Sequence, residues 1–279
     1  MILLLLFVSG AASSGLATRR SVLLSGAAAS LPRPPAFAAT PTASEEVARV
    51  LLEPWEEEPP FGRGGFRRLD ESDDAEFYTQ PRLVNHIDDA AVAAATKFYT
   101  ALFTELASER AAAPEVLDLC SSWVSHYPPD SAVRLGRVAG LGMNAEELQA
   151  NPRLTEWVVR DLNKAPVRLP HADGSFDAVT CTVSIDYLTR PLEVMAECAR
   201  VLRPGGRLAI LISDRLFFSK AVALWTGKDD LEHCYTVGAY IHYGAGAAMA
   251  DPRAIDLSRR SRNGKPIGDP LFAIVATRL

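Results

Sequence analysis

Three acidic residues stand near the ends of short apolar runs of the sequence. Asp118 lies within EVLDL (115–119), Asp161 follows a run that starts at Trp157, and Asp186 follows a run that starts at Phe176. A carboxylate there can accept hydrogen bonds from a ligand, although it can equally cap the next turn. A nucleotide-binding strand is normally followed by a glycine-rich loop, but this chain supplies Cys120, Ser121, Ser122 and Trp123 instead.

A second polar group precedes these runs, in FYTQPRLVNHIDD. Tyr78, Arg82 and His86 are residues that a plain linker would not need, so we expect a cap over a site. His86 is a candidate general base, while a structural role is the alternative. Late in the chain, YIHYGAG (240–246) could line an acceptor pocket or serve as ordinary packing.

Composition excludes some functions. The chain has 279 residues, 48% of them hydrophobic and 23% charged, which suffices for the core of one domain. Its formal charge of −5 gives no basic footprint for nucleic acid. The four cysteines form no CxxC pair, which argues against a structural zinc site. Cys120 is interpreted as a small buried residue, although an oxidising compartment would let it pair with Cys181.

The first residues have the features of a targeting leader. Residues 1–8 are apolar but too short to span a membrane, and no other membrane span is predicted in the mature chain. Arg19-Arg20 and Ala36-Phe37-Ala38 then resemble a twin-arginine signal and its cleavage site. The tandem layout predicts a plastid protein sent on to the thylakoid lumen, with a single stromal transit peptide as the alternative. We therefore divide the chain into a leader (1–38), an irregular arm (39–80) and a domain (81–279).

The domain alternates strands and helices. We expect a helix that starts at the N-cap Asp88, with an inner face of Val92, Thr96, Tyr99, Leu102 and Phe103, and one that starts at Pro191 and is stopped by Pro204-Gly205-Gly206. The alternation predicts an α/β fold, a mostly parallel sheet covered by helices on both faces. The tail DPLFAIVATRL is expected to form a last, antiparallel strand at the sheet edge. The predicted strands are Val116–Leu119, Val138–Leu141, Trp157–Leu162, Phe176–Ser184 and Leu208–Ser213.

Residues 175–213, SFDAVTCTVSIDYLTRPLEVMAECARVLRPGGRLAILIS, resemble the second half of a class I S-adenosylmethionine-dependent methyltransferase domain of the type 11 group. EVLDL is similar to the first strand of that family. The resemblance implies a Rossmann-like fold with S-adenosylmethionine as cofactor. It also implies which positions meet that cofactor.

By this resemblance, Asp118 faces the amino end of the cofactor, and Asp161 and Leu162 bind its adenine ring. The glycines of the family loop are replaced by Cys120, Ser122 and Val124, and the ribose-binding acid by Gly142. Asn144, or else Glu146 or Glu147, could accept a ribose hydroxyl. Trp123 could turn its ring toward the sulfonium. Ser184 stands near the reacting sulfur, and Asp186 and Tyr187 take the place of acceptor-binding residues.

The resulting hypothesis is a metal-free methyltransferase that acts by in-line displacement on a small-molecule acceptor. A non-catalytic scaffold or ligand-binding protein of the same fold is the alternative, because the glycines and the ribose acid are missing. A nicotinamide-dependent dehydrogenase fits less well without G-x-G-x-x-G. An open cleft faced by Asp118 and Asp161 favours the enzyme, whereas a pocket filled by Trp123 and Val124 favours the scaffold. The oligomeric state does not follow from the sequence.

Overall fold

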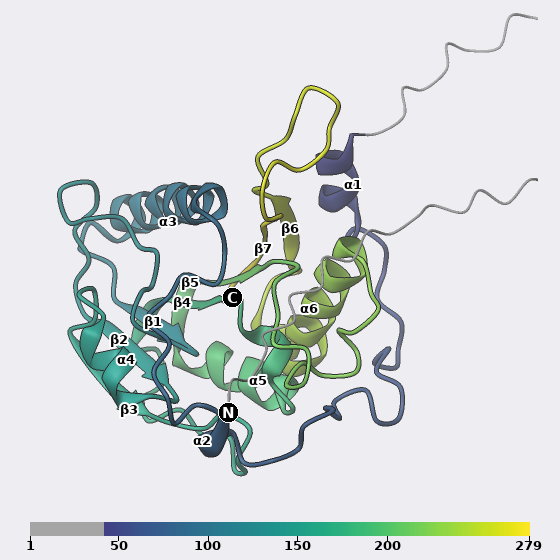
Figure 1. Cartoon of the computed structure of the whole chain (residues 1–279). Helices are drawn as coiled ribbons and strands as arrows, with labels where there is room; N and C mark the ends of the chain where they lie inside the picture. The colour runs from purple at the N-terminus through teal and green to yellow at the C-terminus, as the bar shows by residue number, and fades with distance from the viewer. Residues whose placement is uncertain (1–41) are drawn as a thin grey trace, which may run out of the picture.

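A computed structural model describes residues 42–279, in which seven strands form one sheet. The predicted leader, residues 1–38, lies outside the described residues. In spatial order the strands are β3, β2, β1, β4, β5, β7 and β6 (Figure 1). Their bounds are β1 (Val116–Leu119), β2 (Val138–Gly142), β3 (Glu156–Val159), β4 (Phe176–Thr182), β5 (Leu202–Ile212), β6 (Arg253–Asp256) and β7 (Phe272–Thr277).

The strand directions confirm the predicted class. Strands β1 to β5 run parallel, whereas β7 is antiparallel to both β5 and β6. The expected edge position of the last strand is wrong, because β6 pairs along the outer side of β7. The residues of β1 are buried throughout, as expected for a strand covered on both faces.

Helices cover both faces of the sheet (Figure 1). Tyr99 and Phe103 of α3 share an apolar cluster with Val116, whereas residues of α5 and α6 pack in the opposite cluster with Leu117. Neighbouring side chains of one strand point to opposite faces, which explains this division. The helices are α1 (Ala43–Arg49), α2 (Asp74–Phe77), α3 (Asp89–Arg110), α4 (Ala145–Ala150), α5 (Pro191–Val201) and α6 (Asp230–Ala245), with short 3-10 turns η1 (Ile185–Tyr187) and η2 (Gly246–Ala248).

The start of α3 is the predicted one. Asp88 is the N-cap, and its Oδ1 accepts a hydrogen bond from the backbone N–H of Ala91 at 2.9 Å. Its Oδ2 accepts from the backbone N–H of Asp269, and the Asp269 carboxylate accepts from the backbone N–H of Asp88. This reciprocal pair ties the first turn of α3 to the segment before β7. The inner face holds Ala91 and Ala95 in place of the predicted Val92 and Thr96, which are half-buried.

The boundary between α5 and β5 differs from the prediction. The helix ends at Val201 and β5 begins directly with Leu202, so Pro204-Gly205-Gly206 lie within the strand. Leu202 pairs with Phe176 of β4, and the next pair is Arg207 with Ala178, which leaves a bulge between them. Gly205 adopts a φ of 77° in this bulge. A Pro-Gly-Gly segment that is typical of a helix stop therefore serves here as an irregular strand start.

The arm packs against the body of the molecule. The Trp55 ring stacks on His242 of α6 at 4.8 Å, and Phe61 contacts Tyr240 at 5.3 Å. The side chain of Lys220 is fully buried, with its Nζ 3.3 Å from Asp70 and 3.2 Å from Asp74 of the arm. The arm is largely irregular but contains α1 and α2. Aromatic contacts and a buried cation thus hold it in place.

No helix within residues 42–279 is long and apolar enough to cross a membrane.

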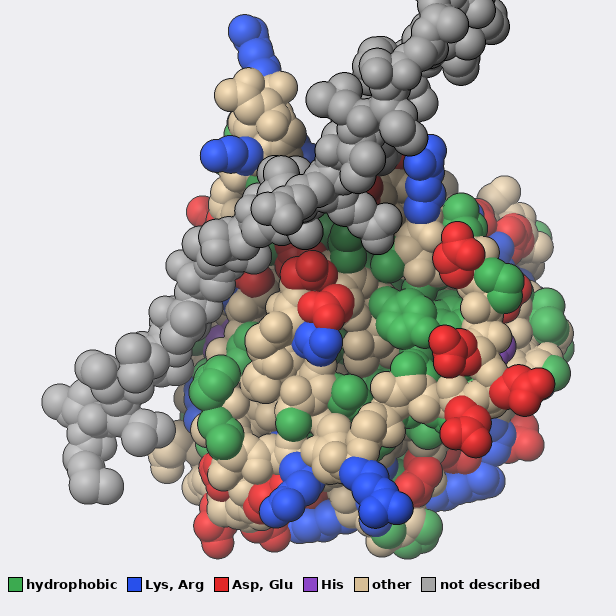
Figure 2. Space-filling view, turned by 90° about the vertical axis from the view of Figure 1, so that its right-hand side faces the viewer, with side chains coloured by type: hydrophobic (Ala, Val, Ile, Leu, Met, Phe, Trp, Pro, Cys, Tyr) green, Lys and Arg blue, Asp and Glu red, His purple; other side chains and the backbone are tan. Residues whose placement is uncertain are grey.

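Figure 2 shows the side of the molecule that lies at the right of Figure 1, where α6 and part of the arm are found. Acidic side chains surround a central group of apolar ones on that side (Figure 2).

The Asp88 contacts predict a measurable contribution to stability. Replacing Asp88 with Ala removes both a helix cap and the tie to Asp269, so we expect the free energy of unfolding to fall by about 1–2 kcal/mol. Asp89→Ala, an exposed change one residue later, should stay within about 0.5 kcal/mol. Urea unfolding followed by circular dichroism measures both values. Equal effects of the two variants would contradict the assigned cap.

Candidate active site

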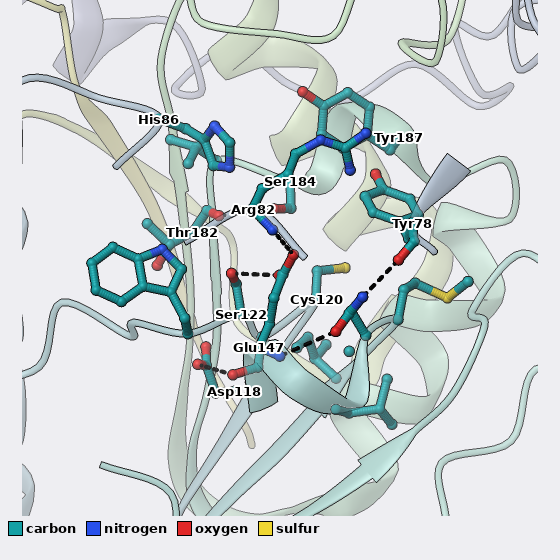
Figure 3. A pocket seen from close by; sticks show the side chains of 18 of the residues that line it. Tyr78, Arg82, His86, Asp118, Cys120, Ser122, Glu147, Thr182, Ser184 and Tyr187 are labelled. Carbon is teal, nitrogen blue, oxygen red and sulfur yellow. Dashed lines mark hydrogen bonds between the residues drawn. The ribbon is translucent and has the colours of Figure 1, made fainter. Parts of the chain in front are cut away.

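A cavity lies beyond the carboxyl ends of β1, β2 and β4 (Figure 3). Its empty volume is about 1340 Å³, including open solvent at the mouth. It is bounded by the loop after β1, by the segment 78–86 that we call the cap, and by residues 215–217 after β5. Of the predicted site residues, the cavity is lined by His86, Asp118, Cys120, Ser122, Trp123, Asn144, Asp161, Leu162, Ser184 and Tyr187.

The carboxylate of Asp118 is buried at the base of the cavity and organises the loop after β1. Its Oδ2 accepts hydrogen bonds from Ser121 at 2.7 Å and Ser125 at 2.6 Å, and its Oδ1 accepts from Thr180 at 3.2 Å. Burial raises the pKa of Asp118 to about 6, against the lowering effect of these hydroxyls. The loop therefore curls around the acid, which stays ionised at neutral pH.

The loop reaches this conformation without glycine. The chain adopts a left-handed φ of 51° at Cys120 and 56° at His126, whereas the φ of Val124 is not positive. The backbone N–H of Ser121 donates to the carbonyl of Leu141 at 2.8 Å, which fixes the loop to β2. The first former glycine position is thus the one that still takes the conformation glycine favours. All four cysteines, Cys120 and Cys181 among them, are free thiols.

The aromatic residues of the loop serve two purposes. Trp123 lines the cavity and donates from its indole nitrogen to the carbonyl of Val84 at 3.1 Å, so it joins the loop to the cap. Tyr127 is buried, packs edge-on against Tyr99 of α3, and hydrogen-bonds to Thr180. Trp123 thus lines the cavity, whereas Tyr127 packs against helix α3.

The end of β2 explains the missing ribose acid. A Cβ at position 142 would lie far inside van der Waals contact with the backbone oxygen of Ser121, so only glycine fits. Asn144 caps α4: its Oδ1 accepts from the backbone N–H groups of Glu146 and Glu147, and its Nδ2 donates to the arm. Both acceptor lone pairs of Asn144 are used, which corrects its predicted role as a ribose acceptor.

Glu147 takes the position that the sequence left open. Its side chain is almost buried and points into the cavity, where Oε2 accepts from Ser122 at 2.7 Å and Oε1 from the backbone N–H of Arg82 at 2.7 Å (Figure 3). A carboxylate of this kind can accept hydroxyl groups of a ligand. The signal in the sequence was its place in the first turn of the helix after β2, which brings it back over the strand end.

Asp161 faces the cavity from a turn rather than from a strand. The third strand ends at Val159, and the Oδ1 of Asp161 accepts from the backbone N–H of Asn163 at 2.8 Å. Its Oδ2 forms an ion pair with the half-exposed Lys164 at 3.7 Å. Asn163, which the sequence did not single out, joins this turn to Asp74 of the arm. The Asp161 carboxylate lines the cavity and can also accept a hydrogen bond from an amine.

Asp186 does not line the cavity, which corrects its predicted catalytic role. Its side chain is 3% exposed, and its Oδ2 has no hydrogen-bond partner within residues 42–279. Burial raises the pKa of Asp186 to about 8, so it is largely protonated at pH 7. Val183 has a φ of 43°, and this turn puts Ser184 and Tyr187 at the cavity and Asp186 in the interior.

The two other predicted catalytic residues do reach the cavity. The hydroxyl of Tyr187 accepts a hydrogen bond from the backbone N–H of Phe217 at 2.8 Å. The ring of His86 lies edge-on to Phe217 at 5.3 Å, and burial lowers the pKa of His86, so the imidazole is neutral at pH 7. A neutral imidazole can accept a proton. Phe217 was missed in the sequence, where its only signal is its position just after the fifth strand.

The segment 240–246 lies elsewhere. Tyr240 is buried and His242 packs against Trp55 of the arm, so the packing alternative is the correct one. Within residues 42–279, no group of three or more histidine, cysteine or acidic side chains could hold a metal ion.

The family comparison bears on this geometry directly. The model described as Methyltransferase domain matches residues 124–210, which include β2, β3, β4 and α5. The predicted resemblance to methyltransferases is confirmed. The matched part supplies Asn144, Glu147 and Asp161 to the cavity, whereas β1 and the cap lie outside it.

Curated relatives are methyltransferases as well. The chain is 35% identical over 97 residues to the ubiquinone/menaquinone biosynthesis C-methyltransferase UbiE of Dinoroseobacter shibae, covering 34% of this chain and 37% of the relative. It is 52% identical over 131 residues to the methyltransferase GfsG of Streptomyces halstedii, covering 45% and 47%. The chain thus spans less than half the length of either relative.

Solved structures give a looser likeness. An S-adenosylmethionine-dependent methyltransferase from Mesorhizobium loti has a TM-score of 0.45 at 15% identity, covering 66% of this chain and 98% of that one. A geranyl diphosphate methyltransferase in complex with GPP and sinefungin has a TM-score of 0.42 at 17% identity, covering 67% and 78%.

The close approach of the Ser121 carbonyl to Gly142 predicts that an acid placed at position 142, where the resembling family has one, destabilises the protein. Gly142→Asp should lower the free energy of unfolding by about 2 kcal/mol or more, because the new Cβ overlaps the Ser121 carbonyl and pushes the loop off β2. Gly62→Asp is the matched control, since a Cβ there meets nothing within 4 Å and its cost should stay within about 0.5 kcal/mol. Chemical unfolding tests the pair. A stable Gly142→Asp protein would show that the loop can yield.

Proposed function

We propose that this protein is an S-adenosylmethionine-dependent methyltransferase that acts on a small-molecule acceptor. One observation carries the proposal: the cavity is open, and both Asp118 and Asp161 line it. Trp123 and Val124 form part of its wall and do not fill it. The methyltransferase relatives support the reaction class.

The polar groups of the cavity suit the donor. Asp118 presents a buried carboxylate for an ammonium group, and Glu147 with Ser122 presents acceptors and a hydroxyl for a ribose. Asp161 presents a carboxylate oxygen that could accept from an exocyclic amine, and Leu162 adds a buried apolar side chain beside it. When bound, the donor supplies an electrophilic methyl group for in-line transfer to a nucleophilic atom.

The remaining residues would prepare the acceptor. His86 is neutral and can hold a proton released by an acceptor hydroxyl or amine. Tyr187 and Phe217 form a fixed wall, joined by the hydrogen bond between the tyrosine hydroxyl and the phenylalanine amide. The cap covers this end of the cavity, which limits water at the reacting atoms. Positioning and water exclusion are the main demands of such a transfer.

A non-catalytic scaffold is the competing function, and a specific observation favours it. Three hydroxyls already bond Asp118, and Ser122 already bonds Glu147, so these acids have partners without a ligand. Binding of the donor separates the two functions. A methyltransferase must bind the donor, whereas a scaffold does not need to.

Donor titration is the direct test. We expect the chain to bind S-adenosylmethionine with a micromolar Kd, and Asp161→Ala to weaken binding by at least about tenfold through the lost amine contact. Isothermal titration calorimetry measures both. Asp130→Ala, an exposed acid paired with Arg153, is the matched control and should bind as the parent does. Absence of heat and of any thermal shift with the parent protein would leave the scaffold.

Donor binding should also depend on pH through Asp118. Burial raises the pKa of this carboxyl to about 6, so it is ionised at pH 7.5 and mostly neutral at pH 5. The neutral acid no longer attracts the donor's ammonium, and affinity should fall by up to about tenfold across this range. Calorimetry at the two pH values, repeated with Asp118→Asn, measures the effect. An equal pH dependence in the variant would assign it to another group.

A further inference from the structure

Arg82 of the cap has an unusual environment for a cation. It lines the cavity, and its guanidinium carbon lies 4.5 Å from the ring centre of Phe77, 5.2 Å from Phe217 and 5.7 Å from Tyr78. Its Nη2 donates to the carbonyl of Phe77 at 3.1 Å. Three aromatic rings and one carbonyl therefore surround the planar group.

The Arg82 guanidinium has one N–H group without a hydrogen-bond acceptor, and no carboxylate of the described residues pairs with its charge. Nη1 is buried and has no hydrogen-bond partner within residues 42–279. In the same part of the chain no carboxylate forms an ion pair with Arg82, whereas Arg68 pairs with Asp74 and Arg207 with Glu105 and Glu109. Glu147 contacts the backbone N–H of Arg82. A buried charge and a buried donor are both costly without a partner.

The position of the guanidinium selects one end of the cavity. In Figure 3 the side chain of Arg82 extends away from Asp118 and toward Tyr187 and Tyr78. Phe217, on which it packs, follows β5 and is tied to the Tyr187 hydroxyl after β4. The acids suited to the donor follow β1, β2 and β3. Arg82 thus belongs to the acceptor end.

We propose that Arg82 recognises an anionic group of the methyl acceptor, a carboxylate carried on an aromatic or apolar body. The inference rests on the proposed methyltransferase function and narrows its substrate class. A guanidinium offers paired donors to a carboxylate, and the surrounding rings offer flat apolar contact to the rest of the molecule. The neutral His86, whose ring also packs on Phe217, stands close by to take a proton from the acceptor.

The test uses benzoate as the probe and benzamide as its uncharged analogue. Each is titrated by calorimetry into the full chain saturated with S-adenosylhomocysteine. Benzoate should bind in the millimolar range, and benzamide at least about tenfold more weakly. Arg82→Gln should weaken benzoate by at least about tenfold and leave benzamide unchanged, with Arg82→Lys in between. Arg160→Gln removes the same charge from the cavity wall and should change benzoate affinity less than about threefold.

Binding of the donor product is measured in parallel, because the carboxylate of the donor's amino acid part could bind Arg82 instead of the acceptor. Arg82→Gln should bind S-adenosylhomocysteine within about threefold of the parent. A large loss of nucleoside binding with benzoate unaffected would assign Arg82 to the donor and overturn the inference, as would equal benzoate binding in parent and variant. If the parent binds no donor, the methyltransferase function fails, and the benzoate series on the free protein still decides the role of Arg82. Melting curves of both Arg82 variants show whether the cap remains folded.

Discussion

The buried carboxylate of Asp118 is the interaction on which the candidate site depends. It stands at the end of a central strand, and the hydroxyls of Ser121, Ser125 and Thr180 converge on it. Because two of these hydroxyls come from the following loop, satisfying the acid also folds the loop. The chain then turns away through Tyr127, which bonds Thr180 and packs on α3. One ionised group thus links the cavity, the sheet and helix α3, which packs on the same face of the sheet.

The end of the cavity beyond β1 and β2 differs from the resembling family at several linked positions. The resembling family places glycines in the loop and an acid at the end of the second strand. Here the loop carries serines, the strand ends in Gly142, and the Ser121 carbonyl occupies the space that an acid would need. The carboxylate returns one helical turn later as Glu147, held by Ser122 of the same loop. Loss of the glycines and displacement of the acid are therefore two aspects of one rearrangement.

Local signals predicted the parts of the fold that depend on neighbours in sequence. The bounds of β1 and the Asp88 cap follow from a short apolar run and an aspartate before an alanine-rich helix. The start of β5 could not be predicted, because Pro-Gly-Gly looks like a stop and only pairing with β4 shows a strand. The turn that buries Asp186 includes a left-handed residue, Val183, which no local pattern predicts. Glu147 was one of three candidates named from the sequence, and the structure selects it, whereas Phe217 reaches the cavity only through tertiary packing.

The ammonium of Lys220 gives the arm a meaning beyond coverage. Its nearest polar atoms belong to Asp70, Asp74 and Ser72, all in the arm, and its side chain has no contact with solvent. A shortened protein that began at residue 81 would lose every one of these neighbours. Removing one partner of a buried ion pair costs about 3–5 kcal/mol when the remaining charge stays buried. The arm therefore supplies the carboxylates that neutralise a lysine of the domain, and it is an integral part of the folded structure.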